Sequence, residues 1–226
     1  MNYLPDSTLK DLQSKIDGIL TPWYYAKYNY YDFAPDVKRC DWGKRDFARL
    51  ISLLEFEAEV DGRHFEDIVL FDGLNDPEVA MLDSDKWTSF EYAKKIDLHT
   101  FDERYRKYDF AMLNQTIEHL YNPVLALENI YHHLRPGGMF YMNFPINNMP
   151  HNEPHHFYTG ITLMGAASLI TMAGFEFVTG GQWGNREYLQ KLMENEAWPT
   201  FNDITCPRLN EEICPIIGWV WGRKEK

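Results

Sequence analysis

The sequence has few cysteines, and they are poorly placed for a disulfide framework or a metal cluster. The three are Cys40, Cys206 and Cys214, and no two of them have the spacing of a CxxC motif or a zinc finger. An odd number of cysteines at such spacing favours a reduced chain without disulfide bonds. We therefore expect no metal site built on thiolates.

Basic residues are also scarce, and long apolar runs are missing. The chain has 22 Lys and Arg against 34 Asp and Glu, a formal net charge of −12. This balance argues against a nucleic-acid partner, because affinity for phosphates comes mostly from clustered Lys and Arg. No apolar run approaches the roughly 18 residues of a membrane span, and Asp6 stands where a signal peptide has its apolar core. We expect a soluble, cytoplasmic protein without a membrane partner. Composition leaves small molecules, glycans and proteins open as its partners.

The middle of the chain predicts a βαβ unit. Phe110 to Leu113 is an apolar run of strand length, and Asn122 followed by Pro123 is an N-cap with proline at the first helical position, where its missing donor costs nothing. Apolar residues recur at helical spacing up to Pro136-Gly137-Gly138, which turns the chain into a second strand over 139–144. In open α/β sheets ligands bind at the carboxyl ends of the strands. The residues after these two strands should therefore border a binding crevice.

Helical and strand patterns extend on both sides of this unit. They predict helices over 7–20, 46–60 and 162–173, strands over 67–71, 175–178 and 216–222, and a strand or turn over 97–101. The last strand is expected to pair antiparallel at the end of the sheet. The predicted fold class is α/β, a Rossmann-like, doubly wound and mostly parallel sheet. Residues 1–62 are expected to form a helical and Tyr-rich extension packed on a domain of residues 63–226.

The order of these elements, with their boundary motifs, resembles the class I S-adenosylmethionine-dependent methyltransferases over roughly Asp67 to Phe177. The motifs are the central strand leading to E-H-L (Asp109 to Leu120), L-x-P-G-G (Leu134 to Gly138), a strand ending in Pro145, a histidine-rich loop (His151 to His156), a helix opened by Thr162, and A-G-F (Ala173 to Phe175). The resemblance implies a Rossmann-like fold, S-adenosylmethionine as cofactor and transfer of its methyl group.

The resemblance also implies positions for the cofactor. These are Asp72 and Gly73 beside the methionine moiety, Glu91 at the ribose hydroxyls, Asp97 and Leu98 at the adenine, and Asn114 and Gln115 at the sulfonium and amino-acid end. The loop after the first strand departs from the family, because one glycine stands where the family has a G-x-G-x-G run. Asp76 is an alternative acceptor for the amino group, and Asp83 and Asp85 are alternatives to Glu91. Each position also has a structural reading as a turn, a solvated acid or a polar strand cap.

Three histidines are candidates for a catalytic base. An acceptor hydroxyl must lose a proton as it attacks the methyl carbon, and imidazole titrates in the range that suits this task. His151 and His155, in the loop after the second strand of the βαβ unit, come first, and His119 comes second. This loop is also an alternative place for a divalent ion, but its spacing is not a recognised zinc signature, so no metal is predicted.

We therefore expect a methyltransferase that acts on an oxygen of a sugar, a glycan or another small hydroxylated molecule. The aromatic tract Trp23 to Phe33 and the side chain of Trp183, which can stack on sugar rings, favour a glycan. One alternative is a catalytically inactive methyltransferase-like binding or scaffold module, which the sparse glycine loop favours. The other is transfer to nitrogen or carbon of a small metabolite.

Overall fold

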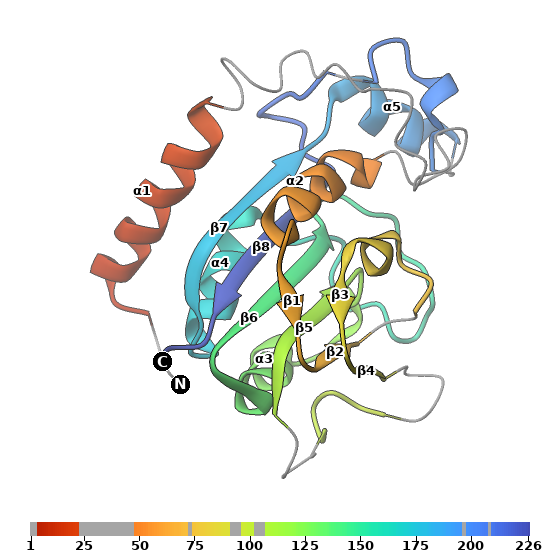
Figure 1. Cartoon of the computed structure of the whole chain (residues 1–226). Coiled ribbons are helices and arrows are strands. Elements are labelled where there is room, and N and C mark those ends of the chain that lie inside the picture. The colour runs from red at the N-terminus through yellow and green to blue at the C-terminus, as the bar shows by residue number, and fades with distance from the viewer. Residues whose placement is uncertain are drawn as a thin grey trace.

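The protein is an α/β molecule built around one mixed sheet (Figure 1). The computed structural model describes residues 4–22, 48–71, 74–90, 96–101, 107–195, 198–207 and 209–226. The helices are α1 (Asp6–Pro22), α2 (Leu50–Val60), α3 (Pro123–His133), α4 (Leu163–Met172) and α5 (Arg186–Asn195), with short 3-10 helices η3 (Pro77–Met81), η5 (Ile117–His119) and η6 (Phe201–Asp203). The predicted tract Trp23 to Phe33 lies outside the described residues.

Six strands form the central sheet in the order β4-β2-β5-β6-β8-β7. They are β2 (Ile68–Leu70), β4 (Trp87–Ser89), β5 (Tyr108–Asn114), β6 (Leu134–Pro145), β7 (Glu176–Trp183) and β8 (Ile217–Arg223). The first four in the sheet order run parallel, and β8 is antiparallel to both β6 and β7. A separate parallel pair joins β1 (His64–Phe65) to β3 (Asp83–Ser84). The predicted fold class is confirmed.

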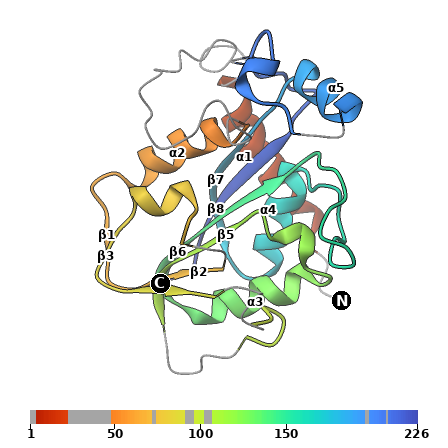
Figure 2. The ribbon, with the colours of Figure 1, turned by 90° about the vertical axis from the view of Figure 1, so that its right-hand side faces the viewer.

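The sheet separates two apolar cores. Alternate residues of β5 point to opposite faces. Ala111 and Leu113 belong to the core that contains apolar residues of α1, α3 and α4, whereas Phe110 and Met112 belong to the core that contains those of α2 and the aromatic side chains of β8. Figure 2 shows α3 and α4 on one side of the sheet and α2 on the other. Both faces are covered, which explains why the strands read as nearly continuous apolar runs.

The position of β8 differs from the prediction. It was expected at the end of the sheet, but it lies between β6 and β7, and β7 is the edge strand. Residues 217–222 are all buried, with Trp219 and Trp221 in one core and Val220 in the other. In this place β8 pairs with a neighbour along both of its edges, and the chain from β7 to β8 is long enough to return there.

Local chemistry sets the helix ends as predicted. The side chain of Asn122 accepts a hydrogen bond from the amide of Leu125 at 3.3 Å, and the hydroxyl of Thr162 accepts from the amide of Gly165 at 3.0 Å. Gly174, with φ +104°, ends the segment that contains α4. The predicted helix over 46–60 is observed as α2 from Leu50, with residues 46 and 47 outside the described part. Residues 97–101 form a turn rather than a strand.

The parallel strands bring their carboxyl ends to one edge of the sheet. β5 ends at Asn114 and β6 at Pro145, and the two strands are in register up to Asn114 and Asn143. β2 and β4 end beside them at Leu70 and Ser89. Among the described residues, no helix is both long and apolar enough to cross a bilayer.

Candidate active site

A buried ionic network occupies the carboxyl edge next to β5. Arg49, at the start of α2, contacts both carboxylate oxygens of Glu78 at 2.7 Å and Asp76 at 3.4 Å. Asp76 also accepts a hydrogen bond of 3.0 Å from the side-chain amide of Asn114, the last residue of β5. Glu78 and Asn114 are fully buried. The network therefore ties α2 and the segment after β2 to the end of β5.

Burial and charge act against each other within this network. Burial would lower the pKa of Arg49, but the carboxylates of Glu78 and Asp76 outweigh it and raise that pKa. Burial raises the pKa of Glu78, and the guanidinium opposes this shift. Both short contacts run from one guanidinium nitrogen, Nη2, to the two carboxylate oxygens of Glu78, and hydrogen bonds between charged groups of this kind are the stronger ones. Two polar atoms of this network, Nε of Arg49 and Oδ1 of Asn114, have no hydrogen-bond partner among the described residues.

Asp97 and Leu98 lie in the turn over residues 97–101, which precedes β5 in the chain. Oδ1 of Asp97 accepts hydrogen bonds from the backbone amide and Nδ1 of His99, at 2.9 and 2.6 Å. Burial would raise the pKa of Asp97, but these hydrogen bonds outweigh it and lower that pKa. Leu98 is buried in the core that contains α3. The pair predicted for the adenine is thus a carboxylate at the surface beside a buried apolar side chain.

Gln115 turns the chain sharply at the end of β5. Its φ of +45° lies in the left-handed region, which few residues other than glycine adopt, and such strain often marks functional sites. Its backbone amide donates to the carbonyl of Asn143 at 2.8 Å, and its side-chain amide donates to Oδ1 of the same residue at 2.5 Å. Both bonds hold Gln115 against the neighbouring strand β6.

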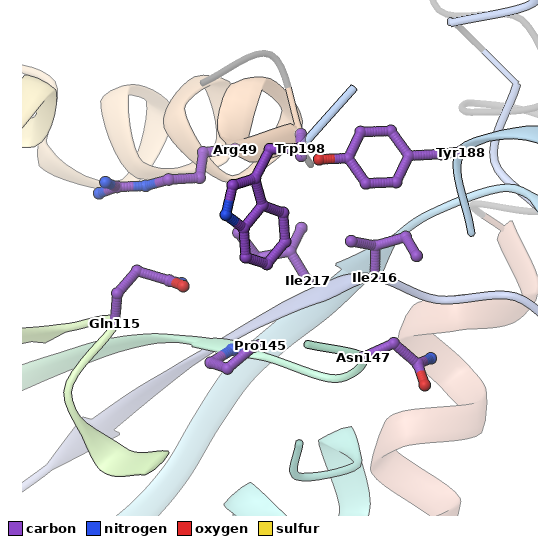
Figure 3. A pocket seen from close by; sticks show the side chains of 9 residues that line it. Arg49, Gln115, Pro145, Asn147, Tyr188, Trp198, Ile216 and Ile217 are labelled. Carbon is purple, nitrogen blue, oxygen red and sulfur yellow. The ribbon is translucent and has the colours of Figure 1, made fainter. Parts of the chain in front are cut away.

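Gln115 lines a cavity of about 240 Å³. The lining residues come from the ends of β5, β6 and β8 and from the segments around α2 and α5: Ala48, Arg49, Gln115, Pro145, Asn147, Tyr188, Trp198, Ile216 and Ile217. Figure 3 shows the indole of Trp198 in the middle of this group, with Arg49 and Gln115 on one side and Tyr188 on the other. The cavity combines aromatic walls with amide groups, a composition typical of small-molecule sites.

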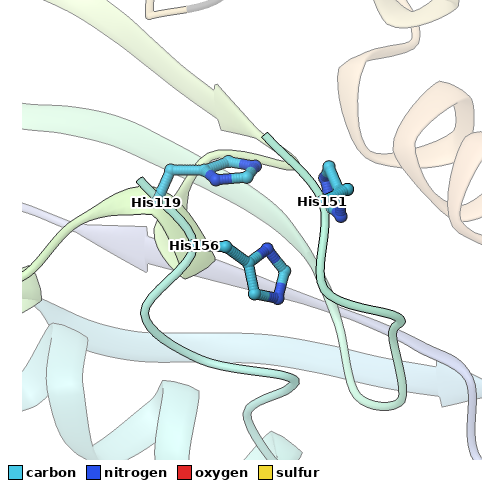
Figure 4. Close-up of side chains that lie close together, drawn as sticks. All are labelled: His119, His151 and His156. Carbon is cyan, nitrogen blue, oxygen red and sulfur yellow. The ribbon is translucent and has the colours of Figure 1, made fainter. Parts of the chain in front are cut away.

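A cluster of three histidines lies on the same edge (Figure 4). His119 ends η5, which follows β5, and His151 and His156 lie in the loop after β6. One ring nitrogen of each lies within 4.8 Å of those of the other two. The backbone joins the two loops, since the amide of Phe157 donates to the carbonyl of Glu118 at 2.8 Å. We call His119, His151 and His156 the histidine cluster.

The surroundings of His119 and His156 favour the neutral form of their imidazole rings. Burial lowers the pKa of His119, and the neighbouring His151 adds to this shift. Burial also lowers the pKa of His156, with a further contribution from His151 and His119. Imidazole in its neutral form is both a base and a metal ligand.

The cluster differs from the predicted set of histidines. His119 and His151 come together as candidates, but the side chain of His155 is exposed and is not part of the cluster. His155 instead offers its backbone carbonyl to Nδ1 of His119 at 2.7 Å. His156 is the third member of the cluster in place of the predicted His155. Its position in the histidine-rich loop was the only signal in the sequence for this role.

Other predicted positions have mixed outcomes. Asp72, Gly73 and Glu91 lie outside the described residues. Trp183 cannot stack on a sugar, because it is buried in the core and packs edge-on against Tyr188. Arg49 and the cavity residues Tyr188 and Trp198 were not predicted, because nothing in the local sequence separates them from ordinary core or surface residues.

Comparisons with known proteins agree with the architecture. The profile of a methyltransferase domain family matches residues 31–196. One similar structure is the 1,6-didemethyltoxoflavin-N1-methyltransferase of Burkholderia thailandensis with bound 1,6-didemethyltoxoflavin and S-adenosylhomocysteine, at 15% identity and TM-score 0.51, over 100% of this chain and 92% of that chain. A search of curated proteins finds no match to the sequence.

Two further structures have the same fold. A putative S-adenosylmethionine-dependent methyltransferase of Listeria monocytogenes is 8% identical with TM-score 0.52, over 81% of this chain and 100% of that chain. An S-adenosylmethionine-dependent methyltransferase of Mesorhizobium loti is 13% identical with TM-score 0.50, over 78% and 98%. These neighbours agree with the predicted cofactor, S-adenosylmethionine. Since the matched profile spans well over half of the sequence, the chain belongs to the methyltransferase domain family.

Proposed function

We propose that the protein transfers the methyl group of S-adenosylmethionine to a hydroxyl oxygen of a small molecule, with a sugar or another polyol as the favoured acceptor. The observation that carries this proposal is the cavity at the ends of β5 and β6, where α/β sheets bind ligands. It adjoins Gln115, which directly follows the cofactor candidate Asn114.

The residues on the cofactor side fit the donor groups of S-adenosylmethionine. Oδ1 of Asn114 is a buried acceptor without a donor among the described residues, and an ammonium group is a donor that would satisfy it. Asp76 lies within hydrogen-bond distance of the same side chain, and Asp97 offers a carboxylate for an amine or hydroxyl. When bound, the cofactor supplies a methyl group made electrophilic by its sulfonium. The protein's task is to orient the acceptor and to exclude water.

The cavity supports a small acceptor. Its volume of about 240 Å³ lies just below the roughly 300–1,000 Å³ usual for ligand sites, which favours a monosaccharide-sized molecule over a macromolecule. Trp198 and Tyr188 offer aromatic surface, and Gln115 and Asn147 offer amide groups for hydroxyls. Trp198 therefore takes the sugar-stacking role that the sequence suggested for Trp183.

His119 and His151 are the proposed bases. Nδ1 of each lies close to a backbone carbonyl, at 2.7 Å from His155 and 2.9 Å from Met149, so Nδ1 carries the proton and Nε2 has a free lone pair. As the oxygen–carbon bond forms and the carbon–sulfur bond breaks, the hydroxyl proton passes to such an Nε2. His155 is less suited, because its side chain is exposed and outside the cluster.

A binding or scaffold module is the second candidate, and one observation favours it. Asp76 is already held by Arg49 and Asn114, so part of the acceptor capacity on the cofactor side is used within the protein. A protein that has lost its cofactor can keep such internal pairing without loss of stability.

Calorimetric titration with S-adenosylmethionine and S-adenosylhomocysteine separates the two candidates. Saturable binding of both is expected, and no saturable heat at millimolar ligand would leave only the module. Transfer of a labelled methyl group to a panel of sugars, polyols, amines and carbon acids then tests the acceptor. If label appears in amines or carbon acids but in no hydroxyl compound, the acceptor atom is nitrogen or carbon and not the proposed oxygen.

A further inference from the structure

We infer that His119, His151 and His156 form a binding site for a divalent transition-metal ion, with Zn²⁺ as the ion best suited to three imidazole ligands. The site does not depend on the proposed function, since a metal ion can be bound whether or not a methyl group is transferred. The sequence analysis named the histidine-rich loop as an alternative place for a divalent ion but predicted no metal, because the ligands come from two loops without a recognised spacing.

The first argument is the convergence of the rings. Their centroids are 4.7 Å apart for His151 and His156, 4.9 Å for His119 and His151, and 5.4 Å for His119 and His156. Figure 4 shows the three side chains around one space between the loop after β5 and the loop after β6. A tetrahedral Zn²⁺ holds its nitrogen ligands roughly 3.4 Å apart, given Zn–N distances of about 2.0–2.1 Å. The present spacing of up to 4.8 Å between ring nitrogens requires them to move closer by up to about 1.4 Å.

The second argument is the orientation of two of the rings. The carbonyl oxygens of His155 and Met149 lie 2.7 and 2.9 Å from Nδ1 of His119 and His151. A carbonyl accepts a hydrogen bond from Nδ1–H, so Nδ1 keeps the proton and the lone pair of Nε2 is left for a metal. Backbone carbonyls commonly fix metal-binding histidines in this way.

The third argument is an unsatisfied ring. Both nitrogens of His156 are buried, and neither has a hydrogen-bond partner among the described residues. Buried polar groups of this kind are rare in folded proteins and call for a ligand. A metal ion bound to one of these nitrogens would give that nitrogen a partner.

The charge of the surroundings also suits a cation. A carboxylate oxygen of Glu118, which is buried, lies 3.8 Å from Nε2 of His119. A negative charge near the ligands lowers the free energy of a bound cation, and outer-shell carboxylates often do this.

Three protein ligands leave at least one coordination position open, as in catalytic rather than structural zinc sites. With the ion bound, an acceptor hydroxyl at that position would lose its proton more easily, so the ion would replace an imidazole base in the proposed reaction.

Zn²⁺ binding to the full chain tests the inference without any methyl donor. The protein is stripped with a chelator, and Zn²⁺ is titrated by calorimetry in competition with a chromophoric chelator. One ion per chain is expected. Replacing His119, His151 or His156 by alanine should weaken binding by more than the roughly 10–100-fold usual for an outer-shell change.

His155→Ala is the matched control, because it removes an exposed imidazole from the same loop and keeps the carbonyl that faces His119. Its affinity should stay within about twofold of the parent. Absence of stoichiometric binding, or unchanged binding in His156→Ala, would overturn the site. So would loss of binding in Cys206→Ser, which removes an exposed thiol.

Two measurements cover the case in which an alanine variant does not fold. Zn²⁺ should raise the melting temperature of the parent protein, since an ion that binds only the folded state stabilises it. Co²⁺ bound to the parent should show visible absorption of a site with nitrogen ligands. Thiolate-to-metal charge transfer in that spectrum, or an unchanged melting temperature with Zn²⁺, would contradict the inference.

Discussion

The two sides of the carboxyl edge differ in how completely their polar groups are paired. On the side proposed for the cofactor, which comprises Asp76, Asp97 and Asn114, most groups bind one another or a neighbour within the protein. On the side proposed for the acceptor, which comprises the cavity and the histidine cluster, three imidazole rings lie close together, and His156 has no hydrogen-bond partner among the described residues. The difference indicates that the cofactor side is built in advance, whereas the acceptor side is completed by what binds there.

The largest effect should come from breaking the network that builds the cofactor side. Arg49→Met leaves Glu78 fully buried without its cation, and Asp76 loses a partner. Removal of one partner of a buried ion pair costs about 3–5 kcal/mol. Urea unfolding should show this loss of stability.

A surface ion pair provides the control for Arg49. Lys15 contacts Asp11 at 3.0 Å with both side chains exposed, so Lys15→Met should cost no more than about 0.5 kcal/mol. The double variant Arg49→Met with Glu78→Met should recover part of the loss. Equal unfolding midpoints for Arg49→Met and Lys15→Met would show that the network does not stabilise the site.

Asn114→Ala tests the cofactor side directly. The substitution removes the unsatisfied Oδ1 and the 3.0 Å bond to Asp76. A hydrogen bond to a charged group contributes about 1.5–3 kcal/mol, so affinity for S-adenosylhomocysteine should fall by about 10- to 100-fold. Calorimetry measures this change, and Asn202→Ala, at an exposed position of η6, is the matched control. Equal affinities of the two variants would remove Asn114 from the cofactor site.

Trp198→Ala tests the acceptor side alone. The indole lines the cavity but not the network around Asp76, so affinity for S-adenosylhomocysteine should stay unchanged. Loss of an aromatic stacking surface should raise the KM for the acceptor by about 10-fold, which corresponds to about 1.4 kcal/mol. Met193→Ala, an exposed change on α5, should leave both quantities unchanged. A rise in the Kd of the cofactor product would mean that the two sides are not separate.

The smallest effect concerns the pH dependence of stability at Asp97. Its pKa in the folded state is lowered from the usual 3.8, because the hydrogen bonds from His99 outweigh burial. The contribution of the carboxylate is therefore present above about pH 4 and is lost as the pH falls through the lowered value. The side chain is 45% exposed, so this contribution should stay below about 0.5 kcal/mol. Unfolding free energies of the parent and Asp97→Asn should converge below pH 4, and divergence there would contradict the assignment.

Much of the fold follows from local signals in the sequence. The cap at Asn122, the proline at 123 and the apolar run from Phe110 to Leu113 fix the βαβ unit, because each acts through neighbours a few residues away. The place of β8 did not follow, since a strand buried on both faces has the same apolar pattern in the interior of a sheet as at a covered edge. Its antiparallel direction was nevertheless predicted correctly.

The sequence by itself determined the fold class, the carboxyl edge and the loops that carry polar residues to it, because strand and helix boundaries depend on local backbone chemistry. Only the tertiary structure decided which side chains meet there. It joined Arg49 to Glu78 across 29 residues, turned His156 rather than His155 towards His119, and buried Trp183. These contacts depend on the path of loops and on long-range packing. Neither produces a periodic pattern or a motif spacing that can be recognised in the sequence.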